Sequence, residues 1–98
     1  MTFQKFVAVR GRFLNVSCND GFRFYVGGTS GGKLHYSTHN NDKWITLEVR
    51  TNKHDPQDEL LLAHAERNLL PEAGAYVYRY VPVPLIHLLI AKHGGEKT

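Results

Sequence analysis

Hydrophobic and polar residues alternate with a period of two through much of the first half of the chain, and this period is typical of half-buried β-strands. The alternation is clearest over residues 43–51, where Ile45, Leu47 and Val49 share one face of the predicted strand. Shorter runs of the same kind cover residues 6–16, 22–26 and 33–38. The first half of the chain therefore predicts four strands.

The segments between these runs carry residues that favour turns. Residues 15–21 end in Asn-Asp-Gly, which tolerates positive φ angles, so the first two strands are predicted to form a hairpin. A glycine-rich connector follows at residues 27–32, and a second turn is predicted at residues 39–42. Because parallel neighbours need crossovers of about a dozen residues, these short connections favour an antiparallel meander.

The hydrophobic period changes to that of a helix after Asp55. This residue is suited to cap a helix that starts at Pro56, and an apolar stripe at three-to-four spacing extends the predicted helix to about residue 70. Alternating tyrosines and valines then predict a fifth strand over residues 75–81, which prolines end. A short, apolar helix is predicted over residues 85–93.

Together these segments predict an α+β fold in a single domain spanning residues 1–98. The expected order is β-β-β-β-α-β-α, in which a four- to five-stranded, mostly antiparallel sheet carries two helices packed on it. A hydrophobic content of 42% is enough for one modest core in a chain of 98 residues.

The formal net charge of +3 hides a polarised distribution of charge along the chain. Residues 1–54 carry eight Lys or Arg against three Asp or Glu, whereas residues 55–98 carry four against six. The β-rich half is therefore expected to present a cationic surface, which favours a partner with an anionic surface.

Cysteine usage and hydropathy exclude several classes of protein. Cys18 is the single cysteine, which rules out an intramolecular disulfide and every zinc motif built on several cysteines. A reducing, cytoplasmic setting is the expected default. The longest apolar run, residues 81–91, holds two prolines and His87, so no membrane span is expected.

Basic and aromatic residues gather on the face of the predicted sheet that points away from the core. Guanidinium groups bind phosphates, and flat aromatic side chains stack on bases. This face could equally be solvated or covered by a helix. The candidate residues for binding a nucleic acid or another anionic partner are Arg10, Arg12, Arg23, Tyr25, His35, Trp44 and Arg50.

Other local patterns fall short of a chemical site. The glycine-rich run before Lys33 lacks the Ser or Thr and the helix that must follow in a phosphate-binding loop. His35 and His39 could approach Asp42, but no cysteine or further ligand assists them. No metal and no cofactor are therefore expected.

Catalysis is the weakest of the functional interpretations. Glu48 with His35 and Arg50 is an arrangement that a small, metal-independent nuclease could use. The simpler interpretation of Glu48 and Arg50 is a cross-strand charge pair. A nuclease is kept as the second alternative.

Tyr76, Tyr78 and Tyr80 fall on one side of the fifth predicted strand. Because aromatic side chains anchor interfaces, this edge could dock another protein or a second copy of the chain in a homodimer. The same tyrosines could instead pack against the predicted helix over residues 56–70.

The sequence favours a non-catalytic binding protein over an enzyme. We expect a small accessory or inhibitor protein that docks on a protein or nucleoprotein partner with an anionic surface, of the kind that viral or mobile-element genomes encode. The first alternative is a nucleic-acid-binding module that uses the basic and aromatic face of its sheet.

Overall fold

A computed structural model describes residues 1–30, 33–34, 36–40, 43–65 and 75–97 of the chain. One antiparallel sheet holds five strands in the order β1-β2-β6-β5, with β7 pairing along the other edge of β6. β3 and β4 form a separate pair. The elements are α1 (Phe3–Ala8), β1 (Phe13–Ser17), β2 (Arg23–Gly27), β3 (Thr29–Ser30), β4 (Lys33–Leu34), β5 (Thr38–Asn40), β6 (Lys43–Asn52), the 3-10 helix η1 (Leu62–His64), β7 (Ala75–Pro82) and α2 (Val83–Lys92).

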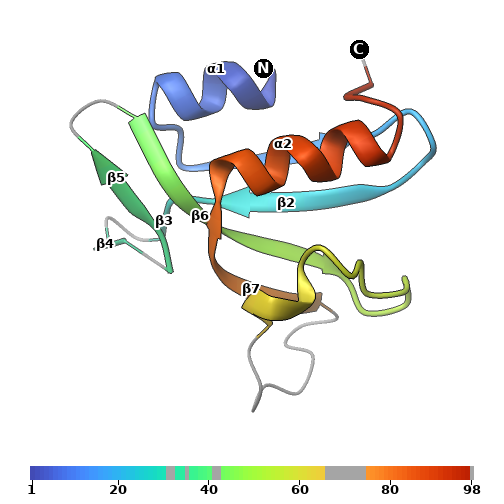
Figure 1. Cartoon of the computed structure of the whole chain (residues 1–98). Helices are drawn as coiled ribbons and strands as arrows, with labels where there is room; N and C mark the ends of the chain where they lie inside the picture. The colour runs from blue at the N-terminus through green and yellow to red at the C-terminus, as the bar shows by residue number, and fades with distance from the viewer. Residues whose placement is uncertain (31–32, 35, 41–42, 66–74, 98) are drawn as a thin grey trace.

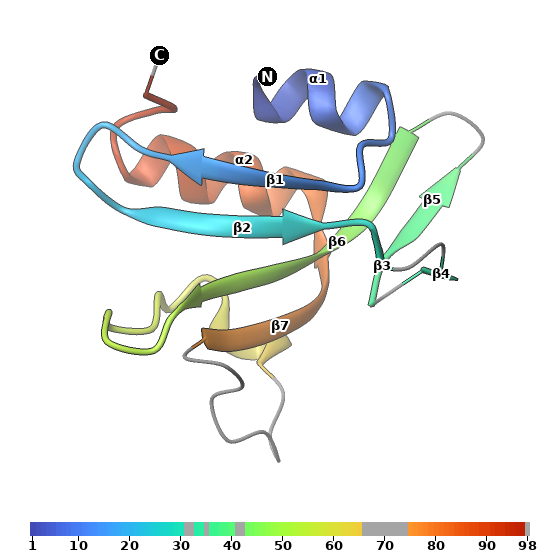
Figure 2. The same cartoon turned by 180° about the vertical axis from the view of Figure 1, so that it is seen from behind.

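The helices lie on one side of the sheet. α2 passes in front of β1 and β2 in Figure 1, and the same strands lie in front of α2 in the reverse view of Figure 2. η1 likewise changes from in front of β7 to behind it. The opposite side of the sheet, which we call the outer face, carries no helix in the part of the chain that the structure describes. This arrangement confirms the predicted α+β class.

The core lies between the sheet and the helices. Burial of a Leu, Ile or Phe side chain contributes about 1.5–3 kcal/mol. The largest fully buried side chains come from α1, the strands, the segment before η1, and α2: Phe3, Phe6, Phe24, Leu47, Leu61, Tyr78, Ile86 and Leu89.

No helix among the described residues is long and apolar enough to cross a membrane.

The strand predicted over residues 6–16 is wrong in its first half. Phe3, Phe6 and Val7 are buried on one face of α1, a helical spacing, and the Thr2 side chain caps this helix by accepting a hydrogen bond from the Lys5 N–H. The chain then turns at Arg10, whose φ is +51°, before β1 begins.

The helix predicted over residues 56–70 is also wrong for the residues that the structure describes, because only η1 is helical between 53 and 65. The Asp58 carboxylate accepts a hydrogen bond from the Leu60 N–H and contacts Lys92 and His93 of the C-terminal region. These tertiary contacts override the local helix signal. Residues 66–70 of the prediction lie outside the described residues.

The alternation predicted along β6 fails near its start. Thr38 pairs with Thr46 while His39 pairs with Trp44, so Ile45 is left without a partner in β5 as a bulge. The bulge places Trp44 and Ile45 on the sides opposite to those expected. Trp44 is buried, with its indole N–H donating to the Gly11 carbonyl at 3.0 Å, whereas Ile45 is exposed.

Candidate functional site

Tyr25 lies at the centre of the outer face. In the strand register it stands directly between Asn15 of β1 and Arg50 of β6. Cross-strand neighbours of this kind have Cβ atoms about 4.5–5.5 Å apart. Arg23, two residues before Tyr25, lies on the same face of β2, because successive side chains of a strand alternate between faces. The sheet therefore groups two arginines around one tyrosine.

These residues share one recess of about 270 Å³. The end of β6, the segment that follows it and the start of β7 contribute Arg50, Thr51, Asn52, Asp55 and Ala75 to its lining. The recess can hold a small planar or anionic group but no folded element. The polar and aromatic residues that line it are Asn15, Arg23, Tyr25, Arg50, Asn52 and Asp55.

The two arginines differ in what holds them. Arg50 donates to the Glu48 carboxylate at 3.4 Å, and Glu48 is buried, so the Arg50 guanidinium has a fixed place. Among the described residues Arg23 is exposed and no hydrogen bond or ion pair engages its side chain. Arg23 is thus available to an anion, and Arg50 is available on the part that Glu48 does not engage.

Phe13 extends the outer face beyond Tyr25. Phe13 is 71% exposed and Tyr25 is 51% exposed. Phe13 pairs with Gly27, two residues from Tyr25 on β2, so the two aromatic side chains stand at a diagonal position about 7–8 Å apart. Because Gly27 has no side chain, nothing from this position separates them. Exposed aromatic side chains of this kind are a signal of a binding surface.

Three of the predicted basic and aromatic residues therefore come together in the recess, namely Arg23, Tyr25 and Arg50. Arg12 is exposed just before β1, outside the recess lining. Arg10 instead contacts the His39 ring, with 2.7 Å between its Nη1 and Nδ1. Trp44 belongs to the core, so its placement on the outer face was wrong. His35 lies outside the described residues.

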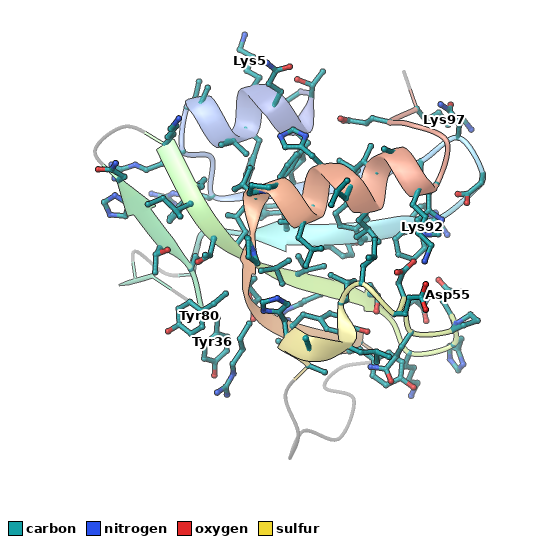
Figure 3. The ribbon with its side chains drawn as sticks, in the orientation of Figure 1. Lys5, Tyr36, Asp55, Tyr80, Lys92 and Lys97 are labelled. Carbon is teal, nitrogen blue, oxygen red and sulfur yellow. The ribbon has the colours of Figure 1, made fainter. Side chains whose placement is uncertain are left out.

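The predicted tyrosine edge is not formed as one exposed stripe. Tyr78 is fully buried, and its hydroxyl accepts a hydrogen bond from Gln57 at 3.1 Å. Tyr76 is half-buried opposite Thr51. Tyr80 alone is exposed, because an extra residue in β7 opposite Glu48 gives it a φ of +50° and sets it edge-on to Tyr36 (Figure 3).

Of the three residues that a nuclease could use, the structure describes Glu48 and Arg50. Glu48 is buried and binds Arg50, its neighbour two positions along the same strand. The charge pair is therefore within β6 rather than across strands. His35 falls outside the described residues.

A second polar cluster, at the C-terminal end of α2, joins three distant segments. The His93 ring contacts Asp20 through Nδ1 at 2.6 Å and Asp58 through Nε2 at 2.8 Å, and it stacks on Phe22 with ring centres 4.0 Å apart. Lys92 donates to Asp58 at 3.1 Å. Because both ring nitrogens face carboxylates, the ring is held as a charged donor, which is a structural role.

The pKa values in this cluster shift as this role requires. Partial burial acts to lower the pKa of His93, but the hydrogen bonds to Asp58 and Asp20 outweigh it and raise the pKa above 6.5. Burial acts to raise the pKa of Asp58, but hydrogen bonds from the Leu60 N–H, His93 and Lys92 outweigh it and lower the pKa below 3.8.

Sequence reasoning missed Phe13, Asn15, Asn52 and Asp55 as members of the outer face, and it missed the His93 cluster altogether. Leu14 and Val16 form the apolar set of β1, which would have put Phe13 and Asn15 on the outer face had the strand start been placed correctly. No local signal links His93 to Asp20 and Asp58, because these residues are far apart in the sequence.

Comparison with known proteins leaves the site to be interpreted from its own chemistry. No protein-family model matches the chain. No curated protein and no solved structure matches it either.

Proposed function

We propose that this protein is a non-catalytic binding protein that holds single-stranded nucleic acid on the outer face of its sheet. One observation carries the proposal: Arg23, Tyr25 and Arg50 line the same recess on the face that no described helix covers. The three side chains supply the two interactions that a single strand offers, phosphate contact and base stacking.

The arginines account for the phosphate contacts. Arg23 is exposed and has no partner among the described residues, so binding a phosphate breaks no existing contact of its side chain. Each phosphate contact to a single strand contributes a slope of about −0.7 to the dependence of log affinity on log salt concentration. Binding is therefore expected to weaken steeply as salt is added.

The aromatic side chains account for the bases. Tyr25 and Phe13 are both at least half exposed and stand on adjacent strands. Stacking of a base on an aromatic side chain contributes about 1–3 kcal/mol and tolerates any base. The pair can hold two bases of one strand in succession.

A duplex fits this face poorly. The bases of a duplex already stack on one another, and a protein reaches the edges of its base pairs with a helix or a two-stranded ribbon that enters a groove. The recess is lined by residues of β1, β2, β6 and β7 and by Asp55, and no described helix contributes to it. A single strand, whose bases are free to turn outward, suits the recess better.

An acidic protein surface would use the same arginines, and aromatic side chains also anchor protein interfaces. The tyrosine edge that favoured a protein partner is largely buried, since Tyr78 is in the core and Tyr76 is half-buried. We favour the single strand because its phosphates use the arginines and its bases use the exposed aromatic side chains.

Fluorescence anisotropy with a labelled, short single-stranded oligonucleotide tests the proposal. Arg23→Gln should weaken binding and make the salt slope shallower by about 0.7. Lys5→Gln removes the same charge from α1, where Lys5 points away from the body of the protein (Figure 3), and should leave the slope unchanged. Tyr25→Ala should weaken binding at every salt concentration.

Absence of binding at low salt would refute the proposal. Equal losses from Arg23→Gln and Lys5→Gln would also refute it, because attraction would then depend on net charge alone. Binding of polyglutamate in preference to the oligonucleotide would point to an acidic protein partner instead.

A further inference from the structure

The recess holds one group that phosphate binding does not explain. Asp55 lines it together with Arg23 and Arg50, and it also borders another recess, beside Asp58 and His93. No hydrogen bond or ion pair engages the Asp55 carboxylate within the described residues. A carboxylate in the same recess as two guanidinium groups repels phosphate. Its place in the recess makes sense when the ligand also brings N–H donors.

The amides in the recess add hydrogen-bonding groups with a definite polarity. The Asn52 side-chain carbonyl already accepts a hydrogen bond from the His54 N–H at 2.9 Å, so its NH₂ remains as a donor. Asn15 stands directly opposite Tyr25 and is exposed. The lining of the recess therefore includes a residue with an acceptor-only carboxylate and residues with amide donors.

We infer that this recess is a base pocket selective for guanine, which stacks on Tyr25 and donates its N1–H and N2–H to the Asp55 carboxylate. The inference rests on the proposed function, since it names the base that the same site prefers. At about 270 Å³ the recess is smaller than the pockets of drug-sized ligands, which suits one base.

The chemistry of the carboxylate selects guanine. A carboxylate accepts two parallel N–H groups at once, as it does from arginine. Guanine presents N1–H and N2–H side by side on the edge that is free in a single strand, and its O6 and N7 are acceptors for amide or guanidinium donors. Thymine and uracil offer a single N–H there, flanked by carbonyls. Adenine and cytosine place a ring acceptor next to the amine, which would repel the carboxylate.

The test compares two oligothymidines that differ only in one exocyclic amino group. One carries a single guanine, and the other carries hypoxanthine, which lacks the exocyclic amine, at the same position. For the wild-type protein hypoxanthine should bind about tenfold more weakly. Asp55→Asn should remove this difference. Because it also removes a repulsive charge, Asp55→Asn should bind plain oligothymidine at least as tightly as wild type, which a damaged fold would not.

Glu59→Gln is the matched control, because Glu59 lies on the same segment, is 82% exposed in its side chain and is not part of the recess. It should keep the preference for guanine. Equal binding of the two oligonucleotides by wild type would overturn the base pocket while leaving salt-dependent binding through Arg23 intact. If the wild-type protein binds neither oligonucleotide, both the proposed function and the base pocket are refuted.

Discussion

Asp58→Asn is the substitution that most sharply tests how the protein holds its C-terminal half together. The Asp58 side chain is only 5% exposed, and it accepts hydrogen bonds from the Leu60 N–H, Lys92 and His93. Asn keeps the size of the side chain but removes the charge. It also turns an NH₂ group toward one of these donors, so that at least one contact becomes repulsive.

The expected cost follows from these contacts. A hydrogen bond to a charged group contributes about 1.5–3 kcal/mol. Removing one partner of a fully buried ion pair costs about 3–5 kcal/mol, but here the Lys92 side chain is 41% exposed, which lowers the figure. We therefore expect a loss of about 2 kcal/mol in the free energy of unfolding, or roughly 8–16 °C in Tm for a domain of this size.

Urea and thermal denaturation followed by circular dichroism measure this loss. Glu59→Gln is the control, since Glu59 is 3.7 Å from Lys92 but exposed, and a surface pair contributes at most about 1 kcal/mol. The urea m-value should stay the same in both variants. A Tm for Asp58→Asn that falls no further than that of Glu59→Gln would refute the role of the cluster.

The remaining predictions concern pH and packing. The pKa of His93 is raised in the folded protein, so His93 contributes its full stability below pH 6.5 and loses that contribution as the pH rises through its folded pKa. The pKa of Asp58 is lowered in the folded protein, so Asp58 contributes stability above pH 3.8 and loses that contribution as the pH falls through its folded pKa. His93→Gln should therefore flatten the alkaline decline in Tm, and an unchanged pH profile would contradict this. Gly28→Ala should cost about 1–3 kcal/mol by denaturant titration, because a Cβ there would overlap the Trp44 ring, whereas Gly27→Ala should be nearly neutral; equal effects would refute the close approach. Cys18 is buried and its pKa is raised by burial and by Asp20 and Glu96, so thiol reagents should modify it only as fast as the protein unfolds, and rapid modification of the native state would contradict that.

The strand signals in the sequence were sound where the pairing was regular. β2 and the later part of β6 follow the predicted alternation, and Phe24, Val26, Leu47 and Val49 are buried as their period requires. The sheet and its antiparallel class could thus be predicted, because a period of two reports directly on which side of a strand is buried.

The sequence-based prediction failed wherever a single residue changed the local geometry. Ile45 forms a bulge that turns Trp44 into the core, and the additional residue in β7 turns Tyr80 outward. A bulge moves the alternation of the strand by one residue, so every side chain beyond it points to the opposite face. No pattern of hydrophobic residues marks where the bulge occurs. For this reason Trp44 and the tyrosine edge were misplaced.

The site was predictable only in its central part. Arg23, Tyr25 and Arg50 lie on regular strands, so their common face follows from their period. Asn52 lines the recess because β6 extends through it. Asp55 belongs to a segment that is not the predicted helix, and the path of that segment depends on the contacts of Asp58 with Lys92 and His93. Contacts across 34 and 35 positions of the chain cannot be inferred from local propensity.

Backbone amide shifts recorded while a short single strand is titrated into the isotope-labelled protein test the central claim most directly. The account predicts that the largest changes fall on the outer face, at Phe13, Asn15, Arg23, Tyr25 and Arg50, and that they fade as salt is added. Changes confined to α1, α2 or the His93 cluster, or no changes at low salt, would contradict it.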